Sequence, residues 1–62
     1  MFYVYINGRK KRVLVTTRRV VDREWRLVAA YRWRVVAMTQ GRRIADRRDY
    51  ILEWAFYSRV EN

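Results

Sequence analysis

Apolar and polar residues alternate through the first part of the chain. Residues 2–6 read Phe-Tyr-Val-Tyr-Ile, a run of aromatic and β-branched residues that is typical of a strand. Asn7-Gly8 follows at once, and this pair favours a two-residue hairpin turn because both central positions of such a turn need positive φ. We therefore expect a hairpin whose second strand begins near Arg9 and continues through residues 13–16.

Residues 25–38 carry a two-sided pattern in which arginines alternate with apolar residues. Arg26, Arg32 and Arg34 share one parity, and most apolar residues share the other. Successive side chains of a strand point to opposite faces, so this segment, if extended, has one cationic and one apolar side. No Gly, Asn or Pro stands at residues 31–34 to make a tight turn. Two strands with a break there or one long bent strand both fit; we favour a four-stranded meander with its third strand over residues 25–31.

The spacing of apolar residues changes after Thr39-Gln40-Gly41, which we interpret as the end of the sheet. Apolar residues then recur at helical intervals, and no Pro or Gly interrupts residues 42–62. The pattern predicts an amphipathic helix over residues 44–58 that covers one face of a small sheet and places Trp54 in the core. The expected fold is one α+β domain over residues 1–62: an antiparallel sheet of three or four strands with one C-terminal helix. The expected core is Val4, Ile6, Val13, Val15, Leu27, Ala29, Val35, Ile51, Leu52 and Ala55.

The composition limits the chemistry available to the chain. Its 62 residues include no Cys and no His, so a disulfide or a zinc site cannot help a core that draws on 52% hydrophobic residues. We expect no metal, no cofactor and no catalytic residue, because the chain has neither a phosphate-binding loop nor a nucleophile elbow. Asp46, Asp49 and Glu53 are spaced to share one side of the predicted helix, and we interpret them as solvated ion-pair partners, as in Arg42 with Asp46.

The charge balance indicates a polyanionic partner. Fifteen basic residues oppose six acidic ones, a formal net charge of +9, and thirteen of the fifteen are arginine. A GC-rich genome or a thermophilic source would explain arginine in place of lysine but not the excess of positive charge. We predict non-enzymatic nucleic-acid binding, with double-stranded DNA ahead of RNA and with little sequence specificity. No run is long enough to span a bilayer and the first residues lack a signal-peptide pattern, so we expect no membrane partner and a cytoplasmic or nucleoid location.

The predicted binding surface combines the hairpin turn with the open face of the sheet. Cations there would hold phosphates, and aromatic rings would stack on bases or wedge between base steps. The residues are Arg9, Lys10, Lys11, Arg12, Arg18, Arg26, Arg32 and Arg34, with Tyr3, Tyr5 and Trp33. A second basic cluster, Arg42, Arg43 and Arg47, is expected around the start of the predicted helix, where backbone N–H groups favour anions. Alternatively, the tyrosines pack on cross-strand neighbours and the open face joins two copies in a homodimer.

The order of a sheet, then Thr39-Gln40-Gly41, then a helix rich in Asp and Ala resembles two protein groups. One is the three-stranded-sheet-plus-helix DNA-binding domains of ethylene-response factors and integrase arm-binding modules, which implies that Arg26, Arg32, Arg34 and Trp33 enter the major groove. The strand-Gly-helix junction at residues 38–41 is similar to that of HicB-type antitoxins, although Arg47 and Arg48 replace their acidic first turn. Size and charge are similar to those of small crenarchaeal chromatin proteins. A viral or antitoxin-like module that binds an acidic protein, or an engineered miniature fold without a ligand, remains the alternative.

Overall fold

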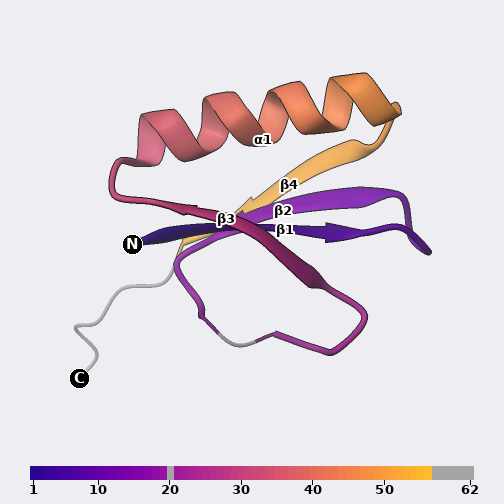
Figure 1. Cartoon of the computed structure of the whole chain (residues 1–62), viewed down its shortest axis with the longest axis horizontal. Helices are drawn as coiled ribbons and strands as arrows, with labels where there is room; N and C mark the ends of the chain where they lie inside the picture. Colours follow the sequence, from indigo (N-terminus) through magenta and orange to yellow (C-terminus); the bar gives the residue numbers. More distant parts are fainter. Residues whose placement is uncertain (20, 57–62) are drawn as a thin grey trace.

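One helix and four strands make up the described part of the chain, residues 1–19 and 21–56 of a computed structural model. In chain order the elements are β1 (Phe2–Asn7), β2 (Arg12–Thr16), β3 (Arg26–Tyr31), α1 (Arg34–Arg48) and β4 (Ile51–Ala55). The helix packs on one face of a four-stranded sheet (Figure 1). The predicted α+β class is confirmed.

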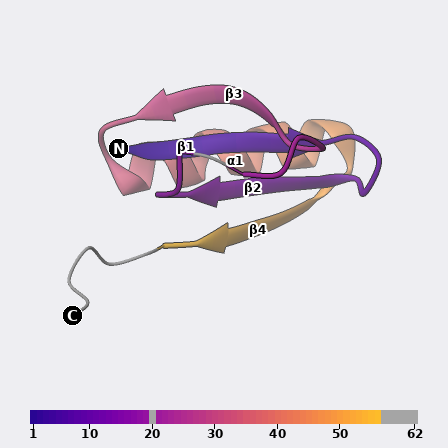
Figure 2. The same ribbon diagram turned by 90° about the horizontal axis from the view of Figure 1, so that it is seen from below.

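The sheet is mixed, with the strand order β3-β1-β2-β4. β1 is antiparallel to both β2 and β3, whereas β4 is parallel to β2, so the prediction of an antiparallel sheet is wrong at this edge. Strands that run in the same direction need a crossover connection. Here α1 joins the edge strands β3 and β4 and crosses over the β1–β2 hairpin (Figure 2). β1 and β2 therefore form the centre of the sheet, and the two strands on either side of α1 in the sequence, β3 and β4, form its edges.

The helix lies ten residues earlier in the chain than predicted, over Arg34–Arg48 instead of residues 44–58. The residues that follow form β4 up to Ala55, and residues 57–58 lie outside the described part of the chain. At the C-terminal end of α1, Asp49 adopts the left-handed conformation with φ 59°. Its N–H donates to the Asp46 carbonyl (3.3 Å) and the Tyr50 N–H donates to the Ala45 carbonyl (2.8 Å). These two bonds form a Schellman motif, which satisfies the last carbonyls and turns the chain into β4.

A stripe of small residues, Ala37, Gly41 and Ala45, is the buried side of α1. A Cβ atom at Gly41 would lie 2.7 Å from Val15 Cγ2 and 3.4 Å from Leu52 Cδ1. The helix therefore lies so close to β2 that only glycine fits at this position. Glycine inside a helix costs about 1 kcal/mol relative to alanine, and close packing on the sheet offsets that cost.

The core lies between α1 and the sheet and is smaller than predicted. Val4, Val13 and Val15 are fully buried together with Ala37 and Ala45, which confirms the predicted valines. The predicted Ile6 and Leu52 are partly buried against this cluster, and Ala29 and Ala55 are half-buried. The prediction is wrong for three residues with exposed fractions of 50%, 72% and 57%: Leu27, Val35 and Ile51. The edge strands turn Leu27 and Ile51 to the face opposite α1, in register with Tyr5 and Arg12.

The β1–β2 hairpin is confirmed, but its turn is longer than predicted. The last strand pair is Asn7 with Arg12, so a four-residue loop, residues 8–11, replaces the two-residue turn and the second strand begins at Arg12. The Asn7 side-chain oxygen accepts a hydrogen bond from the Lys10 N–H (3.0 Å) and organises this loop. Positive φ occurs at Lys11 (56°) and not at Gly8.

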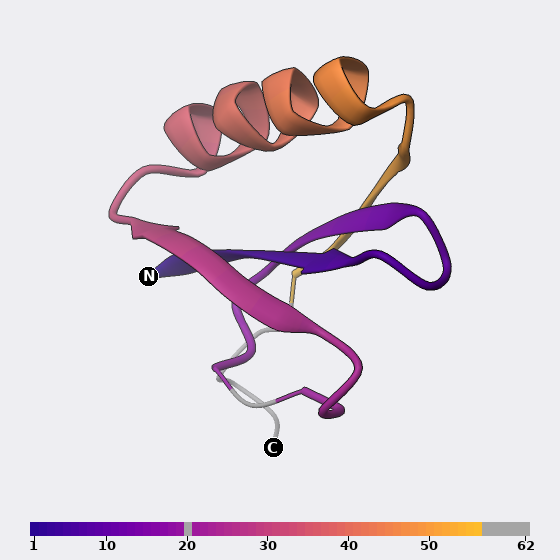
Figure 3. The same cartoon turned by 45° about the vertical axis from the view of Figure 1, so that its right-hand side comes forward.

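The face of the sheet opposite α1 is partly covered by the connection between β2 and β3. Figure 3 shows this connection on the side of the sheet that the helix leaves free. The Tyr5 hydroxyl shares its one hydrogen between the carbonyls of Arg18 (3.1 Å) and Arg19, and Tyr5 is only 3% exposed. Part of the face that was predicted to be open is therefore inaccessible.

Candidate nucleic-acid interface

Five cations gather at one end of the domain, which we call the basic end: Arg9, Lys10, Lys11, Arg47 and Arg48. The first three belong to the hairpin loop and the last two to the final turn of α1, and all are exposed. The loop and the end of the helix lie at the same end of the molecule (Figure 1). The Ile51 N–H donates to the Lys11 carbonyl (3.1 Å) and joins the hairpin loop to the start of β4, three residues after the end of α1.

Three carboxylates lie at or beside the basic end: Asp46 and Asp49, which flank Arg47 and Arg48 in the chain, and Glu24. Glu24 accepts a hydrogen bond from the Asn7 side-chain amide (3.2 Å) and lies 4.0 Å from the Lys10 ammonium. Among the described residues, the other four cations of the basic end form no ion pair. Their charge is therefore available to a ligand. Arg47 and Arg48 also interact favourably with the negative end of the helix dipole.

The cluster of Arg42, Arg43 and Arg47 does not lie at a helix N-terminus as predicted. All three belong to the middle and the last turn of α1, where free backbone N–H groups are absent. The anion site built from N–H groups is therefore wrong. The predicted pairing of Arg42 with Asp46 is confirmed, with 3.9 Å between Nε and Oδ2.

The arginines of residues 26–34 do not share one sheet face, because α1 begins at Arg34. Arg26 is in register with Ile6, whose side chain packs on the helix-covered face. Arg32 lies in the connection between β3 and α1, and the Arg34 guanidinium lies over the Phe56 ring, 5.6 Å from its centroid. The predicted arginine-rich open face is therefore not formed by these residues.

The face opposite α1 does contain Arg12 and the two tyrosines, as their register shows. Arg12 donates to Glu53 Oε2 (2.6 Å), so its charge is already compensated. Tyr3 is half-buried, with its ring centroid 6.5 Å from that of Tyr5. Burial raises the pKa of the Tyr5 phenol above its usual value, the neighbouring Tyr3 raises it further and Arg19 partly lowers it. Tyr5 is packed in place and cannot stack on a base.

The remaining predicted residues lie away from the basic end. Arg18 is exposed in the connection that crosses the sheet, on the face opposite α1. Trp33 is 64% exposed at the start of α1, next to the end of β3. The sequence thus predicted the part of the basic end that lies in the hairpin loop. The other residues predicted for the sheet face do not lie together with it.

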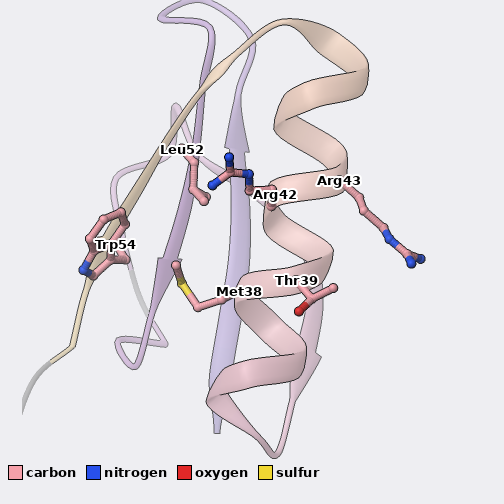
Figure 4. Close-up of a pocket in the computed structure, with 6 residues that line it drawn as sticks. All are labelled: Met38, Thr39, Arg42, Arg43, Leu52 and Trp54. Carbon is pink, nitrogen blue, oxygen red and sulfur yellow. The ribbon is translucent and has the colours of Figure 1, made fainter.

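A groove between α1 and β4 was not predicted from the sequence (Figure 4). It is a cavity of about 430 Å³ lined by Met38, Thr39, Arg42, Arg43, Leu52 and Trp54. Trp54 is 59% exposed, so its predicted core position is wrong. The only sequence signal was the two-residue spacing of Leu52 and Trp54, which places both on one side of a strand.

The comparisons with other proteins add no family assignment. Neither a protein-family model, nor a curated protein, nor a solved structure matches this chain. The resemblances to sheet-plus-helix DNA-binding domains and to HicB-type antitoxins stay predictions. In residues 1–19 and 21–56, no helix is long and apolar enough to span a membrane.

Proposed function

We propose that the chain binds nucleic acid without catalysis and that the basic end holds the phosphate backbone. The observation that carries this proposal is the convergence of five cations from two elements, with one ion pair among them. Neutralising phosphates releases condensed counterions, which drives binding whatever the sequence of the strand. The net charge of +9 adds a long-range attraction for any polyanion.

The absence of catalysis is part of the proposal and is supported by the positions of the carboxylates. Asp46 lies on α1 beside Arg42, whereas Glu53 lies on β4 and pairs with Arg12 on the opposite face of the sheet. The three acidic residues predicted to share one helix therefore belong to different elements. Acid–base chemistry needs groups that reach one substrate together, and these two carboxylates do not.

The test is a fluorescence-anisotropy titration of a labelled oligonucleotide at several salt concentrations. Replacing Arg9 and Arg47 together by glutamine removes two contacts of the basic end. The negative slope of log affinity against log salt should then become shallower, its magnitude falling by about 1.5, because each phosphate contact contributes about 0.7 to 0.9. The matched control is Arg19→Gln with Arg32→Gln, which removes the same charge near the opposite end of the sheet.

Two results would contradict the proposal. Equal losses in the two double variants would show that total charge, and not the basic end, determines binding. No binding by the unchanged protein even at low salt would exclude nucleic acid altogether and favour the acidic protein partner. The exposed Leu27 and Val28 on edge strand β3 would then be the first surface to examine for that partner.

A further inference from the structure

The groove between α1 and β4 has an aromatic wall that the fold leaves uncovered. In the parallel register Trp54 is aligned with Val15, on the face of the sheet that α1 covers. Val15 is fully buried, but Trp54 is 59% exposed because β4 is the edge strand. A large ring on the helix side of the sheet would normally be packed under the helix, and here α1 does not reach it.

The floor of the groove is apolar and its rim is cationic. Met38 and Leu52 lie between α1 and β4, and the Arg42 side chain reaches from α1 toward Leu52 in Figure 4. Arg43 also lines the cavity, but its guanidinium points away from Leu52 and Trp54 in the same view. The ion pair of Arg42 with Asp46 leaves both side chains more than 70% exposed, so water screens it and a ligand can compete for the guanidinium.

An aromatic wall, an apolar floor and one cation at the rim match the parts of a nucleotide. A base offers a flat face for stacking, and the adjoining phosphate offers charge and acceptors to arginine. A base paired in a duplex already has both faces covered, so it would have to be flipped out of the stack to enter. An acidic peptide would use Arg42 but would gain no comparable contact from the Trp54 ring.

We propose that this groove is a base-stacking subsite for single-stranded nucleic acid, in which Trp54 stacks on an unpaired base and Arg42 binds its phosphate. The subsite rests on the proposed nucleic-acid binding and favours a single strand over the double-stranded DNA that the composition alone put first. Arg42 and Arg47 are separated by about 7.5 Å along the helix axis, at about 1.5 Å per residue. A strand of a few nucleotides therefore reaches both the groove and the basic end.

The experiment compares three probes of about twelve nucleotides, a length within the range that one small domain covers. They are oligothymidylate, an abasic strand with the same sugar–phosphate backbone, and a duplex of the same length. Trp54→Leu removes the ring and keeps an apolar side chain. Trp33→Leu is the matched control, because Trp33 is similarly exposed (64%) and lines no part of the groove.

The unchanged protein should bind oligothymidylate about tenfold more tightly than the abasic strand, since stacking of one base contributes about 1 to 3 kcal/mol. Trp54→Leu should lose that preference and the accompanying quenching of tryptophan fluorescence, and Trp33→Leu should keep both. Arg42→Gln should weaken oligothymidylate binding more than Arg43→Gln. Circular dichroism melting checks that the variants fold. If Trp54→Leu does not fold, Trp54→Phe, with its smaller ring, should show an intermediate preference.

The other outcomes separate the subsite from the proposed function. Equal affinity for the thymidylate and abasic strands, or tighter binding of the duplex, would overturn the subsite and leave phosphate binding intact. Equal losses in Trp54→Leu and Trp33→Leu would overturn it as well. No affinity for any of the three probes would overturn both proposals. Displacement of oligothymidylate from the groove by polyglutamate at low concentration would reassign the groove to an acidic peptide.

Discussion

The two glycines of the chain occupy regions with opposite requirements. Gly8 lies in the exposed hairpin loop, does not have positive φ, and a Cβ there would meet nothing closer than the Tyr50 hydroxyl at 3.7 Å. Gly41 is buried in the middle of α1, and a Cβ there would lie 2.7 Å from Val15 Cγ2. The glycine in a turn motif is replaceable, whereas the glycine inside a helix determines how closely two layers of the domain meet.

This difference shows that a turn motif locates a reversal of the chain without identifying its strained residue. The left-handed conformation falls on Lys11 and Asp49, which end the hairpin loop and α1 respectively. Asn7 contributes by accepting a hydrogen bond from the Lys10 N–H, as an asparagine does in many turns, rather than by adopting positive φ. The positive φ of Lys11 and Asp49 and the close approach at Gly41 both depend on how neighbouring elements pack. A short sequence motif carries no information about that packing.

The largest expected effect follows from alanine at each glycine. Gly41→Ala should destabilise the domain by about 1 to 2 kcal/mol, because the new Cβ overpacks a filled contact, which costs about 1 to 3 kcal/mol, and the better helix propensity of alanine offsets about 1 kcal/mol of that cost. Gly8→Ala should instead stabilise it by about 0.5 kcal/mol through the unfolded chain. Urea denaturation of both variants measures the two free energies. Effects of the same sign at the two positions would contradict the comparison.

A smaller effect is expected at Lys11, where the loop needs positive φ. Lys11→Gly should stabilise the domain by about 1 kcal/mol, since the left-handed conformation costs a residue with a Cβ about 1 to 2 kcal/mol and glycine loses part of this gain to chain entropy. Arg9→Gly is the control, because Arg9 lies in the same loop with negative φ and should be destabilised or unchanged. Thermal unfolding at matched salt compares them. A destabilised Lys11→Gly would mean that the lysine side chain matters more than its backbone.

The sequence predicts the local features of this fold better than its long-range ones. The hairpin and its three core valines follow from the alternation of apolar and polar residues over a few positions, because alternate side chains of a strand point to the same face of the sheet. The sequence favours a strand at residues 32–38, where α1 in fact begins, because Trp33, Arg34 and Val35 fit a strand pattern as well as the first turn of a helix. The sequence pattern places the end of the sheet at Gly41, whereas a glycine is needed there because α1 contacts β2, a segment far away in the sequence.

The candidate site divides in the same way. The loop cations of the basic end were predicted because they are consecutive in the sequence. Arg47 and Arg48 were assigned to the start of a helix instead of its end, so their approach to the loop was missed. The groove could not be predicted at all, because its walls belong to α1 and to a strand that was expected to be helical. Its existence depends on tertiary structure alone.

The parallel edge strand has a consequence for the dynamics of the domain. β4 has a single strand neighbour, pairs in the slightly weaker parallel arrangement, and contains no fully buried residue. It should therefore open locally far more often than β1, which is paired on both sides. In a hydrogen-exchange experiment the amides of β4 should exchange before those of β1. Because β4 forms one wall of the groove, each opening also changes the width of the groove. A ligand that binds only when β4 is closed should slow the amide exchange of β4. The local opening of this strand and the occupancy of the groove are therefore thermodynamically linked.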